Sequence, residues 1–339
     1  MIITLESGIS REEAEGVLSG LRWMGFTARL SVEKGCFTIA VIQGVDALTD
    51  MTRFVELAHV REVSPFQHPF KLAAREFRKR DTVISIKGFE VGSGTLAVIA
   101  GPCAVESREQ LMETGRILAE ENVRMLRGGA FKPRTSPYSF QGLGEEGLKL
   151  MKEVAEKYDL ITVSEVMDGE QIEMMSDYVD VLQIGARNMQ NFTLLKKLGK
   201  TGCAIFLKRG LSATYQDLLM SAEYILDKGN PNVMLCERGV RTFETHSRNT
   251  LDIAAVPILH ELTHLPVFVD PSHGTGIRSM VPPMAYAAVA AGADGVMVEV
   301  HPTPDRAMSD KQQTIGPELF SEMMCKIRTI GSTIGVRVP

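Results

Sequence analysis

The feature that most constrains this chain is an alternation of short apolar runs with helical stretches, repeated eight times from residue 96 onward. The runs are Leu96–Ala100, Arg124–Leu126, Ile161–Ser164, Val181–Ile184, Ala204–Leu207, Val233–Leu235, Val267–Val269 and Gly295–Val298. Such strands between helices indicate a parallel sheet buried on both faces. Eight repeats predict an α/β fold with a closed (β/α)8, or TIM, barrel. The alternative is an open doubly wound sheet, but no Gly-x-Gly-x-x-Gly turn follows the first strand.

Residues 1–66 show a different order of elements. Strands are expected over Met1–Leu5, Thr27–Val32, Phe37–Ile42 and Val60–Pro65, and helices over Arg11–Met24 and Asp46–Leu57. The order βαββαβ is that of a small α+β, ferredoxin-like domain. Because few of its polar side chains look reactive, we expect a regulatory or assembly module, and a role in oligomerisation alone is the alternative.

The expected domains are therefore residues 1–66, a basic linker over 67–81, and a catalytic barrel over 82–339. A length of 339 residues suits a barrel of about 250 residues with a small extra domain. Thr82–Ile86 and Phe89–Val91 resemble a β-hairpin, which would plug one end of the barrel.

Bulk composition excludes several classes of protein. A net charge of −5 does not favour nucleic acid or an anionic membrane as partner. The chain has no apolar run of about 18 residues, which a membrane span requires. Five irregularly spaced cysteines indicate reduced thiols, and with no basic-then-apolar leader the expected location is the cytoplasm.

Charged groups follow nearly every predicted barrel strand, at the end where barrels of this type place their active sites. One set is cationic: Arg127, Lys132, Arg134, Arg187, Lys208 and Arg238. So many cations in one mouth indicate phosphate and carboxylate ligands, which arginine binds in bidentate fashion. For Arg209, an exposed surface charge and a ligand-binding cation are equally good interpretations.

A second set could hold a metal ion. Cys103, His273 and Glu299 come from three adjacent strand ends, and Asp310 lies in the loop after the last strand. A thiolate, an imidazole and two carboxylates suit one divalent ion such as Mn²⁺, Fe²⁺, Co²⁺ or Zn²⁺, and ligand type alone does not choose among them. His301 would be a neighbour of this group or a proton carrier, or simply an ordinary packing residue.

Several motifs resemble those of the 3-deoxy-D-arabino-heptulosonate 7-phosphate (DAHP) synthases, in the class close to the 3-deoxy-D-manno-octulosonate 8-phosphate synthases. They are IAGPCAVES at 99–107, LRGGAFKPRTSPYSFQG at 126–142, QIGARN at 183–188, LKRG at 207–210, LCERGVRT at 235–242, VDPSH at 269–273 and VEVHP at 298–302. The resemblance covers essentially the whole chain. It implies a transferase, 3-deoxy-7-phosphoheptulonate synthase, which condenses phosphoenolpyruvate with erythrose 4-phosphate and water in the first step of the shikimate pathway.

The resemblance also implies roles for particular residues. Cys103, His273, Glu299 and Asp310 match the metal ligands. The residues matching those that hold phosphoenolpyruvate are Arg127, Lys132, Arg187, Lys208 and Arg238. Pro133, Arg134, Thr135 and Ser136 match the segment that holds the aldose phosphate. The eight-carbon synthases, which use arabinose 5-phosphate, typically have Lys-Ala-Asn-Arg-Ser-Ser there. Lys311 departs from the family pattern, which usually has glycine after the aspartate.

For the mechanism, Lys132 is the expected proton donor to the aldehyde oxygen, and Glu165 is expected to orient or deprotonate the water. By resemblance we also expect a homotetramer, inhibited by tyrosine or phenylalanine bound at the N-terminal domain. The alternatives are an eight-carbon synthase, a catalytically silent amino-acid-sensing barrel, and an aldolase with a Schiff base at Lys208.

Overall fold

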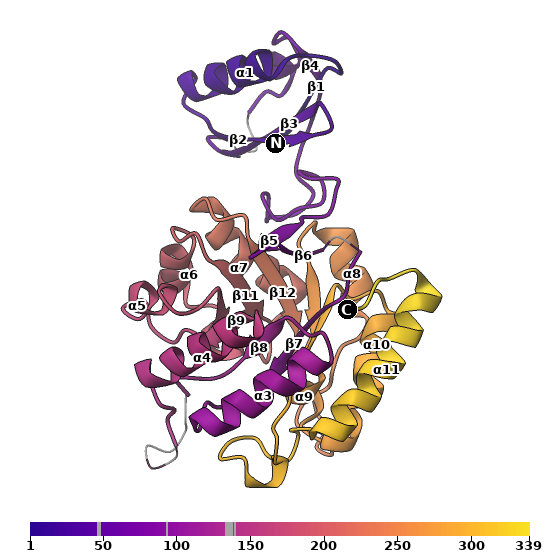
Figure 1. Cartoon of the computed structure of the whole chain (residues 1–339). Coiled ribbons are helices and arrows are strands. Elements are labelled where there is room, and N and C mark those ends of the chain that lie inside the picture. Colours follow the sequence, from indigo (N-terminus) through magenta and orange to yellow (C-terminus); the bar gives the residue numbers. More distant parts are fainter. Residues whose placement is uncertain (46–48, 93, 133–137, 139) are drawn as a thin grey trace. The chain divides into compact units, whose positions relative to one another are not determined.

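The computed structural model describes residues 1–45, 49–92, 94–132, 138 and 140–339 (Figure 1). The chain divides into two compact units. The first comprises Met1–Asp81 together with Glu261–His264, and the second comprises Thr82–His260 together with Leu265–Pro339. None of the helices in the described ranges is both long enough and apolar enough to cross a membrane.

The first unit has the expected ferredoxin-like order. Its elements are β1 (Ile2–Leu5), α1 (Arg11–Trp23), β2 (Thr27–Glu33), β3 (Cys36–Gln43), α2 (Thr52–Val55) and β4 (Val60–Ser64). The strands form one antiparallel sheet in the order β2-β3-β1-β4. Helix α1 begins with a capping box, in which Ser10 and Glu13 each accept the other's backbone N–H, and this fixes where the helix starts.

The second helix of this unit is much shorter than the expected 46–57. Helix α2 spans only Thr52–Val55, and residues 46–48 lie outside the described ranges. The carboxylate of Asp50 accepts hydrogen bonds from both the backbone N–H (2.9 Å) and the hydroxyl (2.6 Å) of Thr52. Such a local turn competes with helical hydrogen bonding. His59, with φ 66°, stands beyond the other end in a left-handed conformation that a helix does not use.

The second unit contains a closed barrel of eight parallel strands, so the open-sheet alternative is wrong. The strands are β7 (Ala97–Gly101), β8 (Met125–Arg127), β9 (Ile161–Glu165), β10 (Val181–Ile184), β11 (Ala204–Lys208), β12 (Val233–Glu237), β13 (Val267–Val269) and β14 (Gly295–Glu299). Strand β14 pairs with β7 and closes the ring. Each strand overlaps the apolar run that predicted it.

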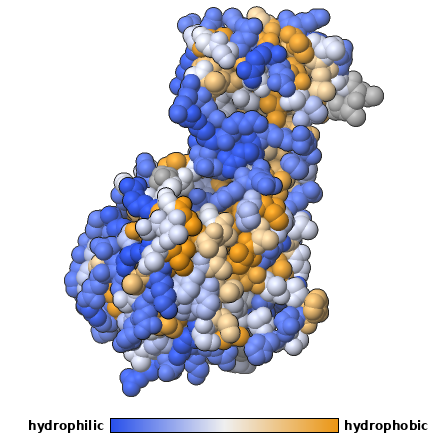
Figure 2. Space-filling view, turned by 90° about the vertical axis from the view of Figure 1, so that its right-hand side faces the viewer, coloured by the Kyte–Doolittle hydropathy of each residue, from blue (hydrophilic) through white to orange (hydrophobic). Residues whose placement is uncertain are grey.

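Helices surround the barrel (Figure 1). They are α3 (Arg108–Glu120), α4 (Glu145–Tyr158), α5 (Ile172–Ser176), α6 (Phe192–Leu198), α7 (Tyr215–Asp227), α8 (Ala255–Leu262), α9 (Pro271–Thr275), α10 (Val281–Ala290) and α11 (Pro317–Ile334). On the face of this unit seen in Figure 2, hydrophilic residues surround smaller patches of hydrophobic ones. Such a surface is ordinary for a folded domain in water.

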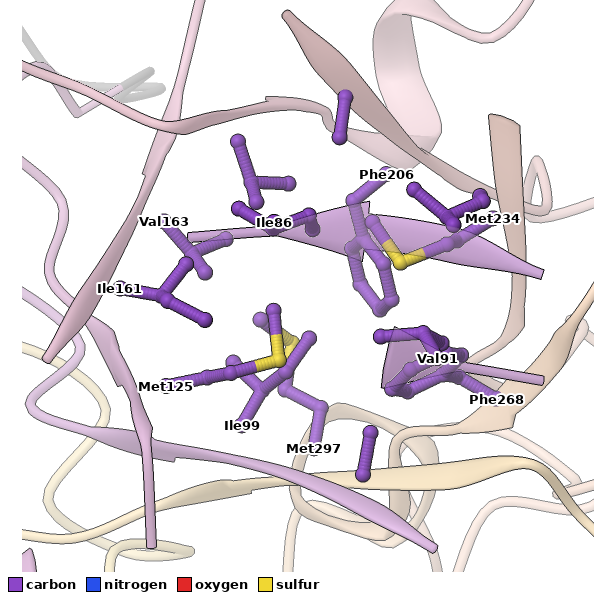
Figure 3. Packing of buried hydrophobic residues seen from close by; sticks show 14 of the residues in the cluster. Ile86, Val91, Ile99, Met125, Ile161, Val163, Phe206, Met234, Phe268 and Met297 are labelled. Atoms are coloured by element: carbon purple, nitrogen blue, oxygen red, sulfur yellow. The ribbon is translucent and has the colours of Figure 1, made fainter. Parts of the chain in front are cut away.

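A hairpin closes one end of the barrel, as expected. Strands β5 (Ile84–Ile86) and β6 (Phe89–Val91) pair in antiparallel fashion. Their side chains Ile84, Ile86 and Val91 share one buried cluster with inward-facing barrel residues (Figure 3). Met125 and Ile161, the first residues of their strands, belong to this cluster. The hairpin therefore covers the amino-terminal end, which leaves the carboxyl-terminal end for the site.

Candidate active site

A pocket opens at the carboxyl-terminal ends of the strands, and it gathers most of the side chains that the sequence singled out. Its charged and amide lining residues are Arg127, Lys132, Glu165, Gln183, Arg187, Lys208, Arg238, Arg241, Arg248, Asn249, His273 and Asp310. Five of the six expected cations are among them. The sixth, Arg134, lies outside the described residues, as do Pro133, Thr135 and Ser136.

The four expected metal ligands lie together beside this pocket. One potential ligand atom from each of Cys103, His273, Glu299 and Asp310 can be chosen so that all lie within 4.8 Å of one another. Cys103 Sγ is 3.1 Å from Asp310 Oδ2, and His273 Nε2 is 3.2 Å from Glu299 Oε1. The order of the strands produces this grouping, because β13, β14 and β7 are neighbours in the ring.

Asp270 orients the imidazole of His273, a role that was not predicted from the sequence. Its Oδ2 lies 2.7 Å from His273 Nδ1 and 2.5 Å from Lys208 Nζ. A carboxylate at Nδ1 favours the tautomer that leaves Nε2 free to bind a metal. The local sequence carried a signal: Asp270 caps helix α9, with Pro271 at its first position, which is a typical helix start.

Two of the cations are already paired with carboxylates. Arg127 Nη1 is 2.6 Å from Glu299 Oε1, and Lys208 is held by Asp270. Lys132 Nζ lies 2.9 Å from the backbone oxygen and 3.1 Å from the Sγ of Cys103. The four expected metal ligands, Cys103, His273, Glu299 and Asp310, are called the metal-ligand group below. This group and the cationic lining therefore form one continuous network.

Burial shapes the protonation of the metal-ligand group. Burial, with the nearby charge of Glu299, raises the pKa of the Cys103 thiol to about 12. Burial acts in the same direction on Asp310, but the charge of His273 and the hydrogen bond from Cys103 outweigh it and lower that pKa to about 2. Burial lowers the pKa of His273. A cation must therefore displace the thiol proton in order to bind Cys103 as thiolate.

The loop that carries Asp310 does not need the glycine usual at 311. Asp310 itself takes the left-handed conformation, with φ 52°, and Lys311 does not. Ser309 Oγ lies 3.0 Å from Cys103 Sγ. His301 does not line the pocket; its Nε2 is 3.4 Å from Glu106, which accepts the backbone N–H of Met308 at 2.8 Å. His301 is thus connected to the Asp310 loop through the carboxylate of Glu106.

Arg209 is not a surface charge. It is buried and pairs with Glu237 at 2.7 Å and Asp252 at 3.0 Å. These bonds tie the end of β11 to the end of β12 and to the segment that follows β12. That segment carries Arg241 and Arg248, two lining cations that were not predicted from the sequence; their closeness in sequence to Arg238 was the available signal.

A barrel whose mouth combines many cations with a Cys-His-Glu-Asp group defines an enzyme that acts on phosphorylated, anionic substrates. The chain belongs to the DAHP synthetase I family, whose model matches residues 74–334. The resemblance inferred from the motifs is therefore confirmed.

Relatives support the same assignment. The phospho-2-dehydro-3-deoxyheptonate aldolase of Thermotoga maritima is 45% identical over 338 residues, which cover 100% of both chains. A crystal structure of that enzyme (DAHP synthase) from Thermotoga maritima has a TM-score of 0.80 at 44% identity, covering 100% of this chain and 99% of the other. The 2-dehydro-3-deoxyphosphooctonate aldolase of Caulobacter vibrioides is 34% identical over 258 residues, 70% of this chain and 88% of its own.

The chain is thus a transferase of the DAHP synthase type, acting in the shikimate pathway and so in aromatic amino acid biosynthesis, as the resemblance predicted. Its reaction condenses phosphoenolpyruvate with erythrose 4-phosphate. The eight-carbon alternative has less support, because the Caulobacter relative is less similar and matches a smaller share of the chain.

Proposed function

We propose that the pocket carries out this condensation with one divalent metal ion held by Cys103, His273, Glu299 and Asp310. The observation that carries the proposal is the convergence of four potential ligand atoms within 4.8 Å beside a cationic pocket. Sulfur, nitrogen and oxygen donors together suit Mn²⁺, Fe²⁺, Co²⁺ or Zn²⁺. The hydrogen bond from His273 to Asp270 supports the fit, since metal-binding histidines usually have such a partner.

Phosphoenolpyruvate is proposed to bind through Arg127, Lys132, Arg187, Lys208 and Arg238. All five line the pocket, and Arg238 is buried, which lowers its pKa and favours an anionic partner. Because the pocket also contains Arg241 and Arg248, it has cations for a second phosphate. The proposal that Pro133, Arg134, Thr135 and Ser136 hold the aldose phosphate rests on sequence alone.

The proposed chemistry forms one carbon–carbon bond. C3 of phosphoenolpyruvate attacks the aldehyde carbon of erythrose 4-phosphate, and the aldehyde oxygen takes up a proton. Water adds at C2, losing a proton, and cleavage of the C2–O bond then releases inorganic phosphate. When bound, the metal ion supplies Lewis acidity toward the aldehyde oxygen. The cations hold both substrates at reacting distance, which accounts for much of the rate.

Two residues are proposed to handle protons. Lys132 lies beside the metal-ligand group, 3.1 Å from Cys103 Sγ, which supports the proposal that it protonates the aldehyde oxygen. Glu165 lines the pocket and accepts a 3.3 Å hydrogen bond from Gln183, which supports the proposal that it orients or deprotonates the water. We expect Lys132→Met to lower turnover by at least about 100-fold while Lys132→Arg keeps phosphoenolpyruvate binding; near-normal turnover of Lys132→Met would refute this role.

The first test is phosphate release from phosphoenolpyruvate, with erythrose 4-phosphate and arabinose 5-phosphate compared, each with and without a chelator. Release with erythrose 4-phosphate that the chelator abolishes is the expected result. A preference for arabinose 5-phosphate would overturn the substrate assignment based on 132–136. Chelator-resistant activity of metal-free protein would overturn the metal site while leaving the substrates in place.

The N-terminal domain, residues 1–66, is proposed to bind tyrosine or phenylalanine as inhibitor in a cytoplasmic homotetramer. Within the first unit, a cavity is lined by Glu13, Val17, Met24, Leu57 and His59, among others. Its apolar side chains suit an aromatic ring, and Glu13 suits an ammonium group. Deleting the domain should abolish inhibition and leave turnover; an intact enzyme indifferent to both amino acids would contradict the proposal.

A further inference from the structure

A buried glutamine connects two parts of the metal-ligand group to a pocket arginine. Gln313 is 2% exposed. Its Nε2 donates to Glu299 Oε2 at 2.8 Å, and its Oε1 accepts from Arg248 Nη1 at 3.1 Å. Arg248 Nη1 also lies 3.5 Å from Asp310 Oδ1. The side chains thus form a continuous chain of contacts from Glu299 through Gln313 and Arg248 to Asp310.

The chemistry of these partners suits an amide at this position. A carboxylate only accepts hydrogen bonds and a guanidinium only donates them. A side chain that joins them must donate at one end and accept at the other, which an amide does. The amide orientation follows from these partners. A glutamate at 313 would place a second carboxylate against Glu299, and an apolar residue would remove both of these hydrogen bonds.

The two carboxylate oxygens of Glu299 have different hydrogen-bond partners. Oε2 is engaged by Gln313, while Oε1 lies 2.6 Å from Arg127 and 3.2 Å from His273 Nε2. Donors on both oxygens fix the plane of the carboxylate. The backbone contributes too, since Gln313 N donates to the Asp310 carbonyl at 3.2 Å.

We infer that Gln313 is a positioning residue that orients Glu299 for the metal ion and links it through Arg248 to the Asp310 loop. The inference rests on the proposed metal site. Outer partners of this kind typically change metal affinity by about 10- to 100-fold when they are removed. The loss arises because Glu299, once freed on one side, must be reordered when the ion binds.

The test measures Co²⁺ affinity by competition with a chelator, together with the visible absorption of bound Co²⁺. Four proteins are compared: the wild type, Gln313→Met, Gln312→Met and Cys103→Ala. Gln312 is the matched control, because it is the adjacent residue in the same loop and its side chain is exposed. We expect Gln313→Met to bind Co²⁺ about 10- to 100-fold more weakly with a changed absorption spectrum, and Gln312→Met to match the wild type.

The outcomes separate the two proposals. Suppose that Gln313→Met has the Co²⁺ affinity and spectrum of the wild type, while Cys103→Ala loses the ion. That result would overturn the role of Gln313 and leave the metal site intact. Wild-type binding by Cys103→Ala would overturn the metal site itself. A general folding defect of Gln313→Met would appear as a lowered melting temperature of the metal-free protein. If that defect is found, Gln313→Glu, which keeps the size of the side chain, replaces it. The inference then stands only if Gln313→Glu shows the same weakened Co²⁺ binding.

Discussion

Arg127 and Glu299 form a buried ion pair, with 2.6 Å between Nη1 and Oε1 and 3% or less of either side chain exposed. This pair joins a residue proposed to hold substrate to a residue proposed to hold the metal. Asp270 makes a similar junction between Lys208 and His273. Binding of the metal ion and of phosphoenolpyruvate should therefore influence each other.

Breaking the first junction should affect both stability and metal binding. Arg127→Met leaves the buried charge of Glu299 without its partner, which costs about 3–5 kcal/mol of unfolding free energy. Arg209→Met is the matched control, because it breaks another buried pair, with Glu237, away from the metal-ligand group. Urea denaturation should show a loss of stability for both variants, and Co²⁺ titration a changed metal affinity for Arg127→Met alone. Unchanged metal affinity in Arg127→Met would contradict the coupling.

Asp270→Asn should weaken metal binding by about 10- to 100-fold. The amide can donate to His273 Nδ1, which would favour the tautomer with the proton on Nε2, the nitrogen that faces Glu299. Lys208 also loses its anionic partner, so the KM for phosphoenolpyruvate should change. Metal titration and steady-state kinetics measure the two effects. If the variant kept wild-type metal affinity, Asp270 would have no role in orienting His273.

Gly185→Ala tests the position of Glu165. Gly185 has an ordinary backbone conformation, φ −67°, but an added Cβ would lie 2.0 Å from Glu165 Oε1. The carboxylate must rotate away, so turnover should fall by about tenfold or more if it handles the water. Gly202→Ala is the control, since no atom lies within 4 Å of its added Cβ. Equal turnover of both variants would remove Glu165 from the mechanism.

Acid should destabilise the first unit through His264. Burial lowers the pKa of His264 to about 4, and its Nε2 lies 2.8 Å from the Leu72 carbonyl oxygen. Because the unfolded chain has a histidine pKa of about 6.5, it binds more protons than the folded one between these values. The stability contribution is complete above pH 6.5 and is lost as the pH falls through 4, by up to about 3 kcal/mol.

The measurement for His264 is urea denaturation at pH 7 and pH 4.5. His264→Gln keeps a donor for the Leu72 carbonyl but cannot take up the proton. Its free energy of unfolding should therefore fall less between the two pH values than that of the wild type. An identical fall in both proteins would show that another group is responsible.

Sequence patterns predicted the barrel strands more reliably than the second helix of the N-terminal unit. The eight barrel strands were identifiable because each is a continuous apolar run, and buried parallel strands require this. The helix expected over 46–57 was too long, because the competing turn at Asp50 depends on a single side-chain geometry that periodicity does not reveal.

The sequence by itself determined which residue types reach the mouth of the barrel, because strand ends fix their positions in the ring. Cys103, His273 and Glu299 were named in this way, Asp310 was named in the loop after the last strand, and the structure brings the four together. Only the tertiary structure decided how the charges are shared: Arg127 pairs with Glu299, Arg209 turns to Glu237, and Gln313 bridges to Arg248. These pairings depend on side-chain directions and on loops packed from distant parts of the chain, and burial makes the first two energetically decisive.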